Sequence, residues 1–217
     1  MQQSRQWPLL LINFAGRVFT WLTFGVFFRV ERRGWHNLPR TGGVMIISNH
    51  ISWFDPVLLN LVLRRAPHWL AMVELFKSRF THWFFTNAGV IPIDRNQPGS
   101  EPLKEAIRWL RAGHALVVFP EGGIHHGPHS VLGGDPVIKE GAALIAVKAG
   151  VPIVPAIIDG ARDTYVRKNW WFRRFAIRLA LGEPFHLPPG CKRAGAHEVI
   201  REKLLALAAE ARQPSRN

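Results

Sequence analysis

Short apolar runs alternate with segments of helical period along most of the chain. Runs with the length and composition of strands lie at 26–32, 44–48, 69–73, 90–93, 115–119, 153–158 and 176–181. Segments with apolar residues at helical spacing lie at 56–64, 101–112, 139–149 and 196–209. Strands alternating with helices are typical of a sheet flanked by helices. The pattern predicts a single α/β domain with a mixed sheet. It also contains one long irregular stretch, at 122–136, and loops of that length are often functional.

The first apolar stretch, residues 7–30, differs because it carries Asn13 and Arg17 inside it. A secretory signal would place its positive charge before the apolar run and end at a small-residue cleavage site, whereas this run ends in Phe27, Phe28, Arg29 and Val30. A central arginine costs a spanning helix roughly 2.5–3.5 kcal/mol on the insertion scale. The pattern favours an amphipathic helix lying in the membrane interface. A true span and a helix folded onto the domain are the alternatives.

Composition points to an acidic partner. The 217 residues, 47% of them hydrophobic, suffice for one packed core. A formal charge of +13 would complement a nucleic acid, an anionic membrane surface or an acidic substrate such as a nucleotide-containing cofactor or a carrier protein. Nine Trp favour the membrane, because Trp prefers the water–lipid interface. The single cysteine, Cys191, excludes an intrachain disulfide and a four-cysteine zinc site, and a reducing compartment fits.

His50 follows the second predicted strand, and Asp55 lies five residues further on. On a continuous helix the two side chains would point about 140° apart, so a turn has to bring them together. Asp55 and Pro56 have the residue types of an N-cap and a first helical position. An ionised Asp55 would hold the proton on one imidazole nitrogen and leave the other nitrogen as a base. The alternative is structural: a histidine at a strand end and a helix cap.

Glu121, Gly122 and Gly123 follow the fifth predicted strand. Glycines let backbone N–H groups approach a ligand closely, as an oxyanion or phosphate site requires. Glycine turns at strand ends are also common for structural reasons, so both interpretations stay open at this point.

Four blocks in register resemble the glycerolipid acyltransferase family, of which 1-acylglycerol-3-phosphate acyltransferase is the central member. The matches are N-H-x-x-x-x-D at Asn49, His50 and Asp55, G-x-I-x-I-D-R at 89–95, F-P-E-G at 119–122 and V-P-I-V-P at 151–155. The resemblance runs from about residue 26 to residue 184 and implies the fold of that family.

The resemblance implies a reaction and a site. A fatty acyl group would pass from acyl-CoA or acyl carrier protein to the free hydroxyl of a lysolipid, with 1-acylglycerol-3-phosphate as the expected acceptor and phosphatidic acid as the product. His50 would be the base and Asp55 would orient it. The residues expected to bind substrate are Asn49, Arg95, Glu121, Gly122 and Gly123. No covalent acyl-enzyme, no metal and no permanently held cofactor is expected.

The same resemblance implies a division of the chain and a location. A membrane-associated helix is expected over residues 1–25, the acyltransferase domain over 26–212 and a flexible tail over 213–217. The protein is expected to be monotopic, at the cytoplasmic face of a membrane with anionic lipids, and to bind no nucleic acid.

Two departures from the family pattern concern the acceptor. Met72 and Ile124 stand where relatives carry a lysine and an arginine that are associated with the acceptor's phosphate. Charge-assisted bonds of that kind are strong enough to select a substrate. Either other cations take over the phosphate, or the acceptor is a different lysolipid with a zwitterionic or amino-acid head group. The candidate cations are Lys77, Arg95, His125 and His126.

Two rival functions remain at this point. His125, His126 and His129, with Asp135 nearby, have the composition of a metal-dependent hydrolase site. Residues 165–175 interleave arginine and lysine with tryptophan, which is the texture of a nucleic-acid-binding module and equally of a membrane-interface loop.

Overall fold

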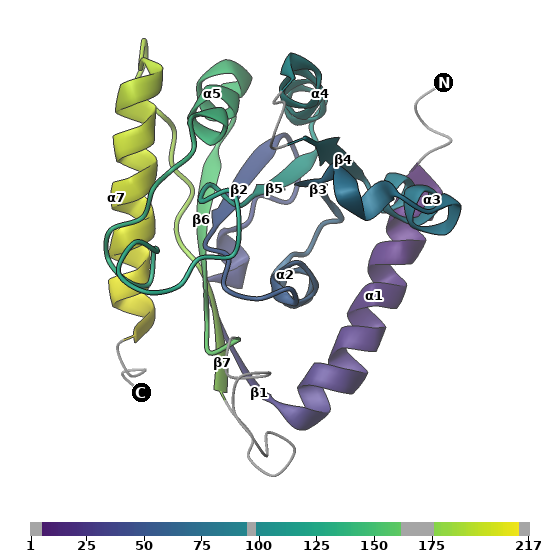
Figure 1. The fold of residues 1–217 in the computed structure, drawn as a ribbon. Coiled ribbons are helices and arrows are strands. Elements are labelled where there is room, and N and C mark those ends of the chain that lie inside the picture. Colours follow the sequence, from purple (N-terminus) through teal and green to yellow (C-terminus); the bar gives the residue numbers. More distant parts are fainter. Residues whose placement is uncertain (1–5, 95–98, 162–175, 213–217) are drawn as a thin grey trace.

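The computed structural model describes residues 6–94, 99–161 and 176–212 (Figure 1). Its strands are β1 (Arg29–Arg33), β2 (Val44–Ser48), β3 (Pro67–Met72), β4 (Val90–Ile93), β5 (Ala115–Val118), β6 (Ile153–Asp159) and β7 (Ala176–Leu181). Its helices are α1 (Gln6–Phe27), α2 (Asp55–Val62), α3 (Arg79–Asn87), α4 (Ser100–Arg111), α5 (Glu140–Ala149) and α7 (Arg193–Arg212), with short 3-10 helices η2 (Trp35–Asn37) and η3 (Val73–Phe76).

The strands form one sheet in the order β1-β7-β6-β2-β5-β3-β4. The five strands from β6 to β4 are parallel to one another, whereas β7 is antiparallel to β6 and β1 is parallel to β7. The predicted mixed α/β sheet is therefore confirmed. We call the edge where the five parallel strands end the carboxyl edge, and the opposite edge the amino edge.

Helices cover both faces of the sheet, which explains why its central strands are apolar throughout. Along β2, Met45 and Ile47 pack with α4, α5 and α7, while Val44 and Ile46 pack with α2. Figure 1 shows the three helices on one side and α2 on the other. Side chains alternate across a strand, so a strand covered on both faces carries a continuous apolar run.

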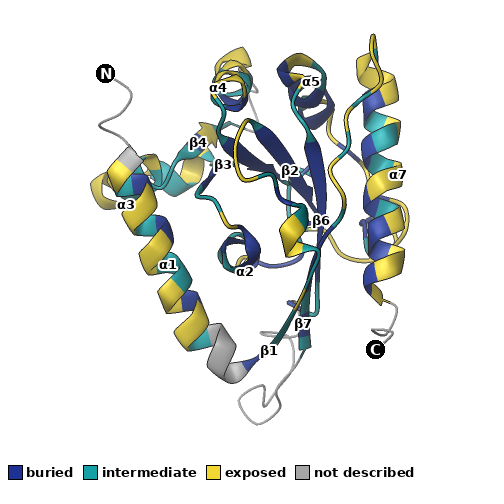
Figure 2. Ribbon diagram, turned by 180° about the vertical axis from the view of Figure 1, so that it is seen from behind, coloured by how far each residue is buried: buried dark blue, intermediate teal, exposed yellow. Residues whose placement is uncertain are grey.

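Helix α1 lies against α2 and turns its polar positions inward. Asn13 is buried, its backbone carbonyl accepts from Asn60 Nδ2 at 3.2 Å, and Arg17 Nη2 donates to the carbonyl of Arg65 at 3.1 Å. The opposite face is apolar and exposed (Figure 2). Its members are Trp7, Leu10, Leu11, Phe14, Val18, Phe19, Trp21 and Leu22. Among the described residues, no helix has the length and hydropathy of a membrane span.

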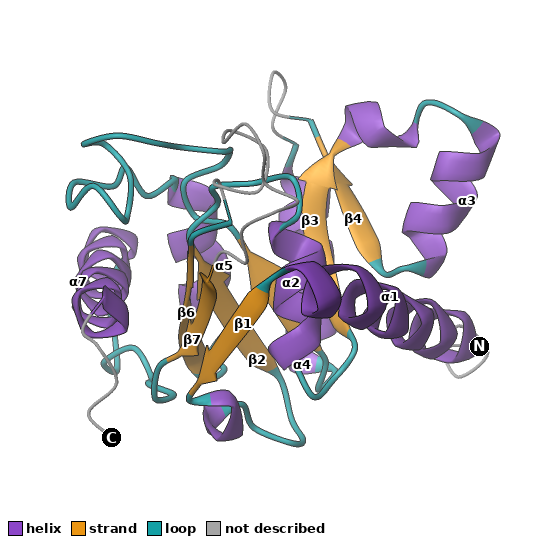
Figure 3. Ribbon diagram, turned by 90° about the horizontal axis from the view of Figure 1, so that it is seen from below, coloured by secondary structure: helices purple, strands orange, loops and turns teal. Residues whose placement is uncertain are grey.

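The predicted boundaries hold at β2, β4 and β7 and move elsewhere. The strand expected at 26–32 begins at Arg29, because α1 continues to Phe27. Helix α3 was not predicted, and none of its residues is fully buried. A signal for it exists: Ser78 and Thr81 form a capping box at its start. Figure 3 shows α3 beside the amino end of α1.

His68 is buried at the amino edge between aromatic rings. Its ring stacks on Trp109 with centroids 4.2 Å apart and meets the edge of His114 at 5.2 Å. Nδ1 lies 3.1 Å from the carbonyl oxygen of Gly89, and Nε2 is buried without a hydrogen-bond partner among the described residues. Burial, reinforced by the charge of His114, lowers the pKa of His68 from 6.5 to about 4.

This burial predicts acid sensitivity. Between the two pKa values the unfolded chain binds the proton and the folded chain does not, so stability is complete above the unfolded value of 6.5 and is lost as the pH falls toward about 4. From pH 7 to pH 5, His68 should lower the free energy of unfolding by about 2 kcal/mol. Urea unfolding at both pH values checks this. In His68→Leu, most of the difference in unfolding free energy between pH 7 and pH 5 should disappear. An undiminished difference in that variant would show that His68 is not its source.

Candidate functional site

The residues with candidate chemistry meet at the carboxyl edge. His50 follows β2, Glu121 follows β5, and Asp159 ends β6. These strands are parallel neighbours, with β2 between β5 and β6. Their ends therefore open at one place, as ligand sites of parallel sheets do.

His50 and Asp55 are in direct contact. Nδ1 of His50 donates to Oδ2 of Asp55 at 2.8 Å. The same oxygen accepts from the backbone N–H groups of Ile51 at 2.6 Å and Ser52 at 2.8 Å. Three N–H donors thus meet at one carboxylate oxygen. The proton of the imidazole is thereby fixed on Nδ1, and Nε2 is the ring nitrogen left to act as a base.

The expected N-cap role of Asp55 is wrong. Helix α2 begins at Asp55 itself, with Phe54 at the cap position and no side-chain cap hydrogen bond. The carboxylate turns back to the loop before the helix, where it binds the N–H groups of residues 51 and 52 instead of those of the first helical turn. Asp55 shapes the loop that carries His50.

Phe119, the first residue of the F-P-E-G block but not among the expected site residues, orients the base. The rings of His50 and Phe119 stack with centroids 4.2 Å apart and planes at 16°. The Asp55 side chain is fully buried, and that of His50 is 13% exposed. Stacking on one face and the carboxylate on one nitrogen leave the imidazole little rotational freedom.

Glu121 is buried and holds two loops together. Its Oε2 accepts from the backbone N–H of His50 at 3.1 Å, and its Oε1 from that of Val131 at 3.0 Å. Burial raises the pKa of Glu121, and the two N–H bonds oppose that rise. The side chain therefore positions the backbone of His50, and its expected contact with substrate stays a prediction.

Asn49 is likewise buried, and both polar atoms of its side chain bind backbone groups. Its Nδ2 donates to the carbonyl of Ile158 at 2.8 Å, and its Oδ1 accepts from the N–H of the same residue at 2.8 Å. The side chain therefore joins the ends of β2 and β6 directly before His50. The structure gives Asn49 a structural role, and its expected contact with substrate stays a prediction.

The stretch from Glu121 to His125 is anchored to residue 50 at both ends. Glu121 binds the N–H of His50, and the N–H of His125 donates to the carbonyl of His50 at 2.9 Å. Gly122 adopts a φ of 76°, which favours glycine, and its N–H donates to Phe119 within the turn. The N–H groups of Gly123 and Ile124 have no acceptor among the described residues, so both are backbone donors available to a ligand here.

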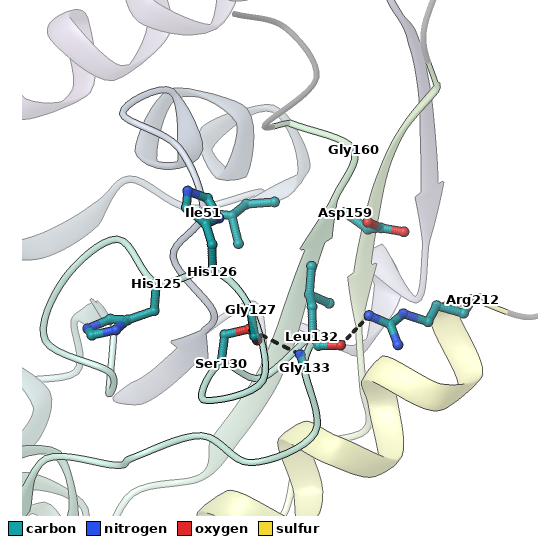
Figure 4. Close-up of a pocket in the computed structure, with 10 residues that line it drawn as sticks. All are labelled: Ile51, His125, His126, Gly127, Ser130, Leu132, Gly133, Asp159, Gly160 and Arg212. Carbon is teal, nitrogen blue, oxygen red and sulfur yellow. Dashed lines mark hydrogen bonds between the residues drawn. The ribbon is translucent and has the colours of Figure 1, made fainter. Parts of the chain in front are cut away.

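A pocket of about 330 Å³ adjoins the loop that carries His50 (Figure 4). Ile51, Asp159 and the histidines 125 and 126 line it together with Arg212 of α7. Arg212 Nη2 donates to the carbonyl of Leu132, which fixes the wall formed by the irregular stretch. The pocket beside the loop of the base thus combines one arginine, two histidines and one carboxylate, where the sequence offered only the histidines.

Some of the residues expected at the site lie away from His50 or outside the described residues. Arg95 and residues 165–175 fall outside the described residues. Met72 ends β3 at the carboxyl edge. His129 pairs with Asp135 at 3.1 Å on the surface, and the described part of the chain contains no group of three residues that could hold a metal ion.

Comparison with known proteins agrees with this geometry. Residues 29–159 match the model of a family described as Acyltransferase. The chain is 29% identical over 172 residues to the 1-acyl-sn-glycerol-3-phosphate acyltransferase of Bacillus subtilis (strain 168). The matched region covers 79% of this chain and 78% of that protein. It is 35% identical over 150 residues to the alpha enzyme of the same name from Homo sapiens, covering 68% of this chain and half (50%) of the human one.

A solved structure shares the architecture. The 1-acyl-sn-glycerophosphate acyltransferase PlsC of Thermotoga maritima superposes with a TM-score of 0.71 at 26% identity, over 99% of this chain and 85% of that one.

The pairing of Asn49 with Ile158 predicts the effect of one substitution. Asn49→Asp replaces the amide donor by a carboxylate oxygen that faces the Ile158 carbonyl in a fully buried place. The free energy of unfolding should fall by about 1–3 kcal/mol, measured by urea denaturation. Asn87→Asp makes the same chemical change at an accessible helix end and should change stability by less than about 0.5 kcal/mol. Equal effects in the two variants would refute the structural role of Asn49.

Proposed function

The chain belongs to the Acyltransferase family and is an acyltransferase, and from this premise we propose that it acylates 1-acylglycerol-3-phosphate to give phosphatidic acid. The single observation that carries the proposal is the His50–Asp55 pair at the carboxyl edge. The names of the relatives support the acceptor.

The proposed reaction needs one base and leaves no proton unaccounted for. Nε2 of His50 takes the proton of the acceptor hydroxyl while the hydroxyl oxygen bonds to the thioester carbonyl carbon. The tetrahedral intermediate then breaks its C–S bond, and the departing sulfur takes the proton from the imidazolium. Asp55 stabilises that imidazolium, as the carboxylate of a catalytic triad does. The acyl group passes directly to the acceptor, with no covalent acyl-enzyme.

Charge develops on the carbonyl oxygen during this step. The N–H of Gly123 is the donor that we assign to it, since its stretch is tied to residue 50 at both ends. A backbone donor fixed before the reaction needs no reorganisation when the charge forms.

The acceptor's phosphate meets different groups here than in relatives that carry two further cations. Met72 and Ile124 cannot neutralise it. The pocket beside Ile51 offers Arg212 and two histidines instead. A planar guanidinium suits phosphate oxygens, so we assign the phosphate to this pocket, with Arg95 as a further candidate.

The donor is acyl-CoA or acyl carrier protein, used as a co-substrate, and the reaction requires no resident cofactor or metal. Both donors are acidic. A formal charge of +13 complements either of them, and a membrane surface with anionic lipids as well. Nucleic acid is not part of the proposal.

The exposed apolar face of α1 supports monotopic association with the cytoplasmic face of a membrane. Trp7 is 72% exposed and Phe14 is 67% exposed. On α3, Phe80 and Trp83 are also exposed. Large apolar faces of this kind mark contact surfaces in soluble proteins, and an aromatic-rich helix face is suited to the membrane interface. The division at residues 25 and 212 stays a prediction, and α1 extends two residues past the first of them.

One experiment tests the reaction. Purified protein is incubated with labelled acyl-CoA and a mixture of lysolipids, and the products are identified by mass spectrometry. Wild type should form phosphatidic acid from 1-acylglycerol-3-phosphate, and His50→Ala should lose about 10²–10⁴-fold in turnover, which is the contribution of a positioned base. His82→Ala, an exposed histidine on α3, is the matched control and should retain turnover.

Full turnover by His50→Ala would refute the base. A wild type that ignores 1-acylglycerol-3-phosphate but acylates a neutral or zwitterionic lysolipid would refute the acceptor and leave the base intact.

A second experiment tests the membrane face. Leu11→Ser with Leu22→Ser removes two exposed side chains of α1, so the fold should be unaffected. Burying a leucine is worth about 1.5–3 kcal/mol, so affinity for neutral vesicles should fall about tenfold or more in a sedimentation assay. Val137→Ser, an exposed change elsewhere, should sediment like wild type. Unchanged sedimentation of the double variant would exclude α1 as the anchor.

A further inference from the structure

A second cavity, of about 500 Å³, lies between α1 and the amino edge of the sheet. His114 and Ala115 at the start of β5 line it, so it opens at the opposite end of the strands from His50. Its volume is within the roughly 300–1,000 Å³ of small-ligand sites. Nothing in the acyl-transfer reaction uses this cavity.

Its polar lining is cationic. Its charged members are Arg17, Arg64 and Arg65, its other polar members are Asn13 and His114, and its described lining residues include no Asp or Glu. In the described part of the chain none of the three arginines makes an ion pair with a carboxylate. Three positive charges therefore converge without a counterion from the protein.

Arg17 is the least compensated of them. Its Nη2 donates to the carbonyl of Arg65, while its Nε is buried and has no hydrogen-bond partner among the described residues. Burial lowers the pKa of Arg17. A guanidinium that is partly desolvated and lacks an anion carries an energetic cost that a bound anion would offset.

Arg65 and Arg64 frame the cavity in different ways. Arg65 is immobilised by donating to the carbonyls of Pro39, Gly42 and Gly113. Arg64 is exposed and lies over the ring of Trp35, 3.8 Å from its centroid. A fixed cation inside and an accessible one outside suit a multivalent anion such as phosphate.

The remaining lining indicates an amphiphile. Leu10 and Phe14 line the cavity and also belong to the exposed apolar face of α1. Arg17 follows Phe14 by three residues, so the stripe changes from apolar to cationic within one helical turn. A ligand with its phosphate on the arginines would have an apolar path along α1 for its acyl chains.

We propose that this cavity binds the phosphate head group of an anionic bilayer phospholipid, at a site separate from the acceptor site at His50. The proposal rests on the membrane association of α1 proposed above. The bound lipid would join α1 to the amino edge of the sheet through Arg17 and Arg64. Anionic lipid would thus hold α1 on the domain while the apolar face of α1 enters the membrane interface.

The test compares the full chain with single-charge variants on phosphatidylcholine vesicles, with and without phosphatidylglycerol. Arg17→Gln and Arg64→Gln remove one charge each from the cavity. Arg79→Gln removes one exposed charge beside Phe80 on α3 and measures diffuse attraction, which is worth about 1 kcal/mol, or roughly fivefold, per residue. The two cavity variants should each lose at least about tenfold of the affinity gained from phosphatidylglycerol, and both should bind phosphatidylcholine like wild type.

Hydrogen exchange of the α1 backbone supplies a second readout. Phosphatidylglycerol vesicles should slow exchange in wild type and in Arg79→Gln more than phosphatidylcholine vesicles do, and the extra protection should be absent in both cavity variants. Equal losses of affinity in all three variants would assign the effect to diffuse charge and overturn the proposal. Equal protection by inorganic phosphate without vesicles would overturn the lipid as occupant.

These outcomes are distinct from failure of the proposed function. Turnover of 1-acylglycerol-3-phosphate in neutral detergent micelles should be the same in wild type and in both cavity variants. Absent turnover in wild type would refute the acceptor, whereas the vesicle and exchange results would still decide whether the cavity binds lipid.

Discussion

Three consecutive backbone N–H groups, those of residues 50, 51 and 52, point at two buried carboxylates. Glu121 accepts a hydrogen bond from the first N–H and Asp55 from the next two. Side-chain carboxyl oxygens therefore take the place that the carbonyl oxygens of a neighbouring strand would have in a sheet. The imidazole of His50 is held as a consequence of this backbone arrangement. Removing either carboxylate would therefore release the loop as well as alter the chemistry.

The sequence predicted the elements that bury apolar surface and the pairing of His50 with Asp55. Helix α3 was missed because periodicity reports burial and α3 buries none of its residues. The family resemblance identified Asn49 and Glu121 as parts of the site, but their hydrogen bonds to Ile158 and Val131 depend on how the chain folds, which the motifs do not contain. Their structural roles could be read only from the fold.

The N-terminal helix shows why a polar residue inside an apolar segment can mislead. Arg17 argues against a membrane span, and Asn13 argues for burial in protein. Both residues are explained by a helix with two different faces along its length. One face packs on α2 through Asn13 and the other remains apolar. Hydropathy averaged over a window of sequence makes such a helix look uniformly apolar, although in the fold it has one packed face and one exposed face.

Helix α7 reaches from the far end of the chain to the wall of the pocket beside His50. Arg212 holds the carbonyl of Leu132, and His197 lies 2.9 Å from that of Ile138. The irregular stretch is thus shaped by the last helix as much as by its own residues. Substitutions on α7 can therefore reshape the pocket beside His50 without altering the base or the two carboxylates that hold its loop.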